Sequence, residues 1–174
     1  MKPNISLWQF AGLSLSSLFG TILHFLYDWT NKSLFIAPIS GVNESIWEHM
    51  KLLYVPLFIF ALIQSRFFKY YKNFWCIKLV GILAGLLLIP ILFYTYNGAF
   101  GKSPDLINIA IFFVSAATIF ILEWYLFKKN TIKCKRPWLA FLFICFIGVL
   151  FILFTFVTPK IPIFKDPLTG TYGI

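Results

Sequence analysis

The only two histidines of this chain fall near carboxylates, in two segments that could bind a metal ion. His24 and Asp28 stand one helical turn apart near the end of an apolar stretch, and Glu44 and His49 follow in the polar segment GVNESIWEHMK. Imidazole and carboxylate groups are ligands of zinc, iron and manganese. We therefore take His24, Asp28, Glu44 and His49 as candidate ligands of a divalent metal such as zinc.

The same polar segment offers carboxylates for acid–base chemistry. If a helix begins near Asn43, a suitable N-cap, then Glu44 and Glu48 lie one turn apart on it. A metal ion with an open position can activate water, and a neighbouring glutamate can act as general base. This predicts hydrolysis of a lipid ester or amide, with Glu44 and Glu48 as candidate catalytic residues.

A purely structural interpretation of these residues stays open. Asp28 could accept a hydrogen bond from His24, and Glu44 and Glu48 could stabilise the positive N-terminus of the following helix. Glu48 could also pair with Lys51. The spacing matches no H-E-x-x-H type of zinc motif, so the pattern alone does not decide between the two.

The elements that must position these residues are membrane-spanning helices. The chain has 174 residues, of which 60% are hydrophobic, 21% aromatic and only 12% charged. A spanning helix needs about 20 predominantly apolar residues. Five stretches qualify, at about 7–27, 43–65, 77–96, 106–127 and 138–157. The sequence thus predicts one all-α transmembrane domain over residues 1–174.

Lys and Arg residues indicate the orientation of this bundle. One side of the predicted topology carries Lys2, Arg66, Lys69, Lys72, Lys78, Lys128, Lys129, Lys133, Lys135 and Arg136. The other side carries Lys32, Lys51, Lys102, Lys160 and Lys165. The positive-inside rule then predicts a cytoplasmic amino terminus and an external carboxyl terminus. Membrane lipid, rather than nucleic acid, is the expected partner of the basic loops.

Further polar residues are expected around the outer site. Asn43, Tyr94, Asn97 and Tyr172 are candidate cavity residues, and the tail FKDPLTGTYGI could fold back as a lid anchored by Tyr172. The stripe of small residues from Gly12 to Gly20 indicates close helix packing.

Two features of the inner side have simpler interpretations. Cys76, Cys134 and Cys145 are expected to be small apolar fillers rather than an extracellular disulfide. Glu123 is expected to be paired or to snorkel near Lys128 and Lys129.

The blocks HFLYDW, APISGVNESIWEHMKLLY, LIPILFYTYNG and FKDPLTGTYGI resemble those of a family of small bacterial multi-pass membrane proteins without an assigned activity. This resemblance covers most of the chain and implies a protein of the bacterial inner membrane. It implies no function.

A fainter likeness is to the membrane metal hydrolases of the alkaline ceramidase and adiponectin receptor type. Those enzymes use three histidines, an aspartate and a serine around zinc at one membrane face. Only His24, Asp28 and Ser17 of this chain could correspond, and the His-x-x-x-His pair of those enzymes is missing.

Three classes of function are therefore carried forward. The first is a metal-dependent hydrolase of lipid at the outer face. The second is a small-ligand binding or transport protein that uses the same polar cavity. The third is a non-enzymatic helper that meets a membrane-protein partner or a second copy of itself.

Overall fold

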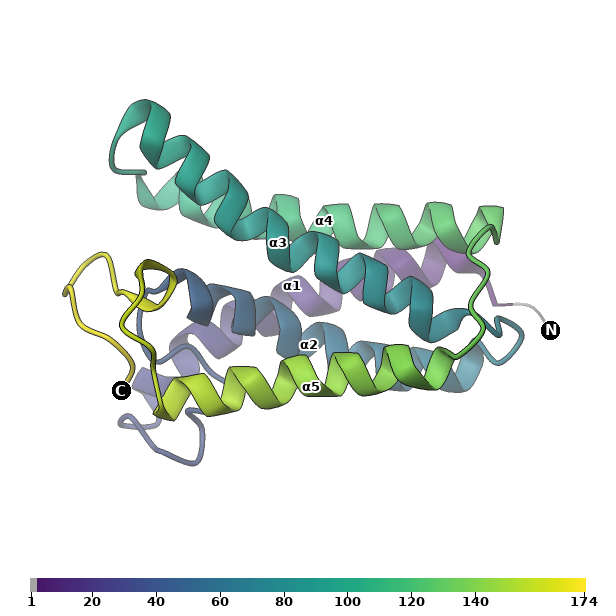
Figure 1. The fold of residues 1–174 in the computed structure, drawn as a ribbon, viewed down its shortest axis with the longest axis horizontal. Helices are drawn as coiled ribbons and strands as arrows, with labels where there is room; N and C mark the ends of the chain where they lie inside the picture. Colours follow the sequence, from purple (N-terminus) through teal and green to yellow (C-terminus); the bar gives the residue numbers. More distant parts are fainter. Residues whose placement is uncertain (1–2) are drawn as a thin grey trace.

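The computed structural model describes residues 3–174 and contains five long α-helices (Figure 1). Each is long and apolar enough to cross a membrane, as the sequence predicts. The described residues contain no β-strand, only an isolated bridge between Lys165 and Tyr172. The helices are α1 (Ile5–Trp29), α2 (Ile46–Phe67), α3 (Phe74–Phe100), α4 (Asp105–Lys129) and α5 (Pro137–Phe156), followed by the short 3₁₀ helix η1 (Pro162–Phe164).

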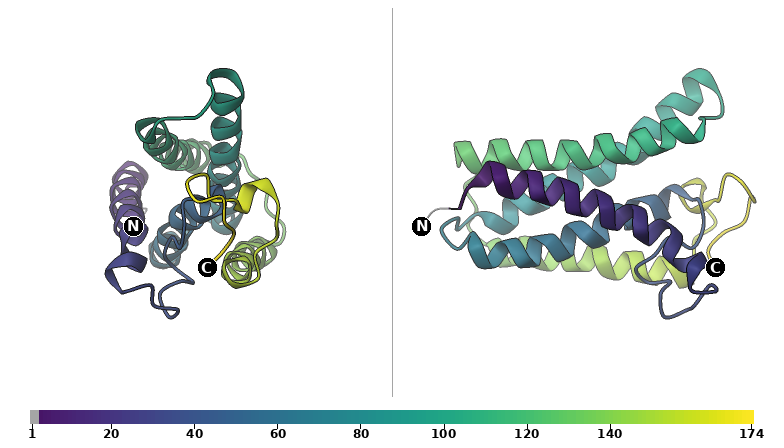
Figure 2. Two further views of the ribbon diagram at one scale, coloured as in Figure 1. Left: turned by 90° about the vertical axis from the view of Figure 1, so that its left-hand side faces the viewer. Right: turned by 180° about the vertical axis from the view of Figure 1, so that it is seen from behind.

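Helix α2 is the centre of the bundle. Seen along the bundle it lies between α1 and α5, with α3 and α4 together on one side (Figure 2). It packs against all four other long helices. Its residues Leu53, Leu57 and Ala61 are fully buried, at one-turn spacing along one face.

Helices α3 and α4 form an antiparallel pair whose connected end diverges from α1, α2 and α5 (Figure 1). Pro90 lies inside α3. Proline has no backbone N–H and clashes with the preceding turn, so it bends helices. The divergence separates the first half of α4 from α2, where residues of both helices line a cavity.

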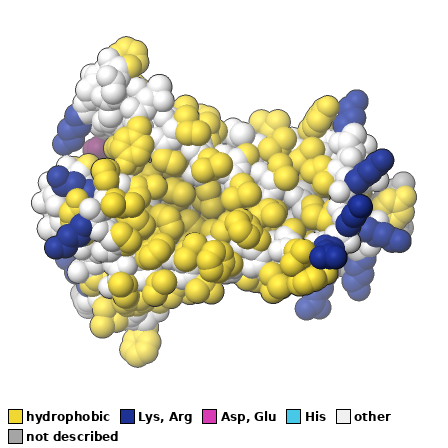
Figure 3. Space-filling model, viewed as in Figure 1, with side chains coloured by type: hydrophobic (Ala, Val, Ile, Leu, Met, Phe, Trp, Pro, Cys, Tyr) yellow, Lys and Arg dark blue, Asp and Glu magenta, His cyan; other side chains and the backbone are white. Residues whose placement is uncertain are grey.

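The start of α1 and the carboxyl terminus lie at opposite ends of the bundle (Figure 1). On the face shown in Figure 3, hydrophobic side chains cover the middle of the molecule and Lys and Arg side chains lie near the two ends. This distribution matches a hydrocarbon layer around the middle of the bundle. Lys2, which we expect at the inner end, lies outside the described residues.

Two lysines that were predicted to lie on the aqueous sides are buried within the helical bundle instead. Lys51 and Lys78 are both inaccessible to solvent, and each pairs with a buried glutamate. Lys78 Nζ lies 2.7 Å from Glu123 Oε2 and donates to Gln64 Oε1 at 3.2 Å. The prediction that Glu123 is paired is therefore confirmed, but its partner is Lys78 of α3 rather than a lysine of its own helix.

The cysteine prediction was wrong for two of the three residues. Cys76, at the start of α3, and Cys134, in the segment between α4 and α5, form a disulfide with their Cα atoms 6.3 Å apart. They are 58 residues apart in the sequence and meet because α4 returns the chain to the end where α3 begins. Cys145 of α5 is free and half-buried.

Candidate metal centre

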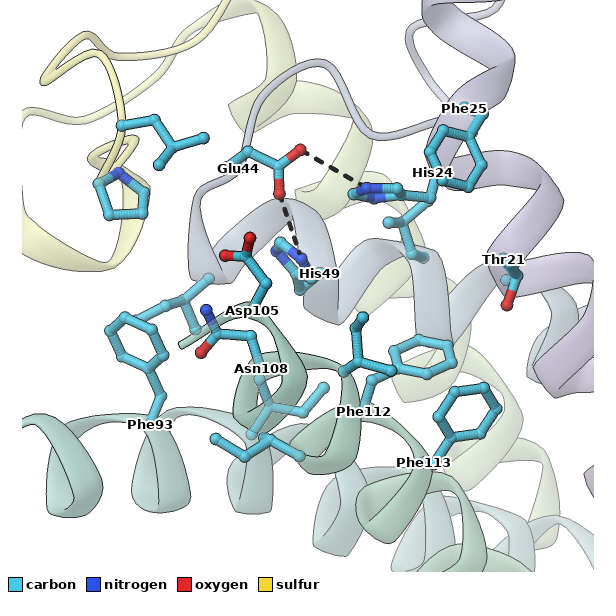
Figure 4. A pocket seen from close by; sticks show the side chains of 18 residues that line it. Thr21, His24, Phe25, Glu44, His49, Phe93, Asp105, Asn108, Phe112 and Phe113 are labelled. Atoms are coloured by element: carbon cyan, nitrogen blue, oxygen red, sulfur yellow. Dashed lines mark ion pairs between the residues drawn. The ribbon is translucent and has the colours of Figure 1, made fainter. Parts of the chain in front are cut away.

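Three side chains from two helices and one loop meet at the end of the bundle where α1 ends and α2 begins. Glu44 lies between His24 and His49, with Oε1 3.5 Å from His24 Nε2 and Oε2 3.6 Å from His49 Nε2 (Figure 4). One ligand atom from each residue can be chosen so that all three lie within 4.8 Å of one another. Two imidazoles and one carboxylate form a donor set typical of catalytic zinc and non-haem iron.

The ring of His49 is held in the orientation that a metal ligand needs. Its Nδ1 lies 2.9 Å from the backbone carbonyl oxygen of Ser45, one turn earlier in the chain. A carbonyl only accepts hydrogen bonds, so Nδ1 carries a proton, and Nε2 is the nitrogen that the neutral ring can offer to a metal ion. Metal-binding histidines commonly donate their second ring nitrogen in this way. This Nε2 faces Glu44.

Glu44 can reach both histidines because it is not part of a helix. Helix α2 begins at Ile46, with Ser45 as N-cap, and the Ser45 hydroxyl accepts a hydrogen bond from the Glu48 backbone N–H at 3.3 Å. The predicted N-cap, Asn43, was two residues too early. Asn43 instead accepts from the Ser45 N–H at 2.9 Å and so shapes the turn before the cap.

The loop that carries Glu44 is bound to the end of α1. The Ser40 hydroxyl donates to the Leu23 carbonyl and accepts from the Tyr27 N–H at 3.0 Å. Gly41 N–H donates to the same Leu23 carbonyl at 3.4 Å. Since His24 follows Leu23 directly, these bonds fix the loop beside the first histidine.

Glu48 lies outside this cluster. Its Oε2 is 2.6 Å from Lys51 Nζ, and the two side chains are 3% and 0% exposed. Glu48 also accepts from the Val42 N–H at 3.0 Å, while Lys51 donates to the Ala37 carbonyl at 2.8 Å and to Thr155 Oγ1 of α5 at 2.7 Å. The structural interpretation expected this pairing but placed Glu48 in water; the pair is instead buried and anchors the loop that carries Glu44.

A cavity of about 470 Å³ opens next to the cluster. Its polar lining comprises Thr21, His24, Glu44, His49, Asp105 and Asn108, and its remaining walls are mainly aliphatic and aromatic. Asp105 begins α4 and lies beside His49 in the close view (Figure 4). Asp105 and Asn108 were not among the predicted site residues. Asp105 is in the first turn of α4 and Asn108 is one turn later, so the two share a face of the helix. This spacing could have indicated that they belong to one site.

The other predicted site residues lie around the cavity rather than in it. Asp28 is exposed and is not one of the three clustered ligands. Tyr94 is also largely exposed, and Asn97 bonds to Ser103, where it closes the turn between α3 and α4. Ser17 accepts through its backbone carbonyl from Thr21 and does not line the cavity.

The carboxyl-terminal segment folds back over the site, as the lid interpretation expects. Pro167 and Leu168 line the cavity, and the Gly173 carbonyl accepts from Asn43 Nδ2 at 2.9 Å. The anchor is therefore Asn43, the neighbour of Glu44. Tyr172 instead bridges to Lys165 within the tail itself.

A protein-family model covers residues 1–174, and its description is a family of unknown function, DUF6512. The chain belongs to DUF6512. This agrees with the resemblance to a family without an assigned activity. No curated protein and no solved structure matches the chain, so the likeness to alkaline ceramidases and adiponectin receptors gains no support.

Proposed function

We propose that this DUF6512 protein binds a divalent metal ion at His24, Glu44 and His49 and uses it to hydrolyse an ester of a membrane lipid. The observation that carries the proposal is the cluster of three ligands at the wall of a cavity. Three protein ligands leave a position open for water or substrate, which distinguishes catalytic zinc sites from closed structural ones.

The observed cluster must contract to hold zinc. Ligand atoms at about 2.0–2.2 Å from a tetrahedral ion lie roughly 3.3–3.6 Å from one another. The histidines lie 3.5 and 3.6 Å from different oxygens of Glu44, and the ligand atoms of all three residues lie within 4.8 Å of one another. Zinc fits hydrolysis best among the metals that this donor set accepts, because the reaction involves no change of oxidation state.

The bound ion would act as a Lewis acid on the ester carbonyl. Asp105 faces the same cavity and would accept a proton from the attacking water. The water oxygen bonds to the carbonyl carbon, the bond to the alkoxy oxygen breaks, and Asp105 returns the proton to that oxygen. The products are a carboxylic acid and an alcohol. Glu48 is not our candidate base, because its carboxylate is already paired with Lys51.

Purified protein in lipid vesicles tests the hydrolytic step. We expect release of free fatty acid, measured by mass spectrometry, that a chelator abolishes and added zinc restores. Asp105→Asn should slow this release by about 10²–10⁴-fold, as loss of a general base does, while the bound metal is retained. An unchanged rate in Asp105→Asn would exclude Asp105 as the base.

A second function, binding of an amphipathic ligand without chemistry, is favoured by the largely apolar walls of the cavity. The same vesicles separate the two functions. Metal-loaded protein that releases no fatty acid from any major class of ester lipid would contradict the hydrolase proposal and support this binding function.

A further inference from the structure

The cavity ends inside the bundle where α1 and α4 come into contact, and we call this end the floor. Gly12 packs against the Phe120 ring, and a Cβ atom on Gly20 would lie 2.6 Å from Phe112 Cζ. The missing side chains of Gly12 and Gly20 thus let the two helices pack closely over the inner half of α1. Beyond Gly20 the helices are separated by the cavity, since Thr21 of α1 and Ile109 of α4 both line it.

Between α1 and α4, the cavity wall reaches the lateral surface of the bundle, which faces lipid. Phe25 of α1 and Phe113 of α4 line the cavity, yet their exposed fractions are 46% and 43%. They lie on spans, where the surroundings of an exposed aromatic side chain are lipid rather than water. We call this part of the cavity wall, at Phe25 and Phe113, the lateral mouth.

The interior of the cavity combines an apolar floor with a nearly neutral polar end. The floor is made by Leu52, Ile111 and Phe112, which are 2%, 7% and 9% exposed. The polar end carries two carboxylates, Glu44 and Asp105, and the lining contains no Lys or Arg. With a divalent cation bound, the formal charges of this end cancel.

We infer that the lateral mouth between α1 and α4 admits an acyl chain of a neutral ester lipid, such as a diacylglycerol, from the surrounding bilayer. The chain lies over Phe112, and the ester reaches the polar end. This inference rests on the proposed function for the fate of the ester, but not for the binding of the chain. The cavity lining offers no lysine or arginine to pair with an anionic headgroup, whereas a neutral ester lipid needs no such partner.

Photolabelling tests this inference. The protein is placed in phosphatidylcholine vesicles that contain a small fraction of diacylglycerol with a diazirine near the end of one acyl chain. Lipid around the bundle reaches only exposed side chains. We expect adducts on the buried floor residues Leu52, Ile111 and Phe112, located by peptide mass spectrometry. Adducts confined to exposed residues of the spans would overturn the inference.

Variants at the mouth provide matched controls. Phe113→Trp and Thr21→Trp add bulk to the two walls and should lower labelling of the floor severalfold. Ile121→Trp adds the same ring to α4 at an exposed position outside the cavity and should not. Floor labelling that is equal in all three variants would contradict lateral entry.

Two further comparisons separate this inference from the proposed function. His24→Ala should lose the metal and keep the floor adducts, because His24 is at the polar end. Wild-type protein that binds no metal but gives these adducts would refute the proposed function alone. Phosphatidylglycerol with the same labelled chain should label the floor severalfold less than diacylglycerol does. Equal labelling by the anionic lipid would overturn the assignment to neutral lipids.

Discussion

Glu44 and Glu48 are four residues apart, yet their surroundings give them different roles. Glu44 precedes the helix and faces two imidazoles, whereas Glu48 is in the first turn of α2 and is buried against Lys51. The sequence predicted that five residues converge, since imidazoles and carboxylates in a bilayer are costly without partners: His24, Asp28, Glu44, Glu48 and His49. Only His24, Glu44 and His49 form the cluster. The sequence pattern alone did not show that Glu44 and Glu48 have different roles. The Ser45-x-x-Glu48 pattern, a capping-box signature, was the signal that places the helix start after Glu44.

Lys51→Met tests the role of the buried pair. It leaves the Glu48 carboxylate buried without its cation, so we expect the free energy of unfolding to fall by about 3–5 kcal/mol. Chemical denaturation in detergent measures this change. The Glu48→Gln/Lys51→Met double variant removes both charges and should recover most of the loss. An unchanged stability of Lys51→Met would contradict the anchoring role.

The same substitution should affect metal binding indirectly. Lys51 bonds to the Ala37 carbonyl and, through Glu48, holds Val42, so it supports the loop that presents Glu44. Outer-shell partners of metal ligands are typically worth 10–100-fold in affinity. We expect a loss in this range for folded Lys51→Met protein, measured by competition with a zinc chelator. Wild-type affinity would mean that Glu44 is placed independently of this pair.

At the scale of the helices, hydropathy predicted the number and approximate bounds of the spans. It could not predict which helices meet, because apolar surface is present on every face. The contact between α3 and α4 depends on two small residues: a Cβ atom on Gly81 would lie 2.7 Å from the Glu123 carboxylate, and one on Gly85 would collide with Ile119. Lys78 could be recognised as an intramembrane residue only once α3 was known to begin at Phe74, ahead of the predicted start.

Gly81→Ala tests this helix contact, with Gly98→Ala as its control on the same helix. The new methyl group at Gly81 would displace Glu123 from Lys78, and overpacking of this kind costs about 1–3 kcal/mol. A Cβ atom on Gly98 meets nothing within 4 Å, so there alanine should stabilise the helix by about 0.5–1 kcal/mol. Thermal unfolding in detergent compares the two. Equal effects would contradict the close contact at Gly81.

At the scale of the whole molecule, two features of the basic end indicate opposite compartments. The cluster of Lys and Arg at the ends of α2 and α4 favours the cytoplasm, whereas disulfides such as Cys76–Cys134 persist in oxidising compartments. We propose that the charge bias decides the orientation, so that the disulfide end is cytoplasmic and the metal site faces outward.

Reporter fusions at the carboxyl terminus test this orientation in a bacterial host. We expect alkaline phosphatase, which is active only outside the cytoplasm, to be active there. Green fluorescent protein exported unfolded should be dark at the same position. A fluorescent fusion with inactive phosphatase would reverse the topology and place the His24 and His49 end in the cytoplasm.

The metal content of the purified protein tests the central claim most directly. Protein prepared without metal-affinity steps would be loaded with zinc, desalted and analysed by inductively coupled plasma mass spectrometry, beside His24→Ala, His49→Ala, Glu44→Gln and the carboxylate control Asp28→Asn. We predict stoichiometric zinc in the wild type and in Asp28→Asn, and its loss in the other three variants. Folded wild-type protein without bound zinc, or zinc retained in all three ligand variants, would contradict the metal site.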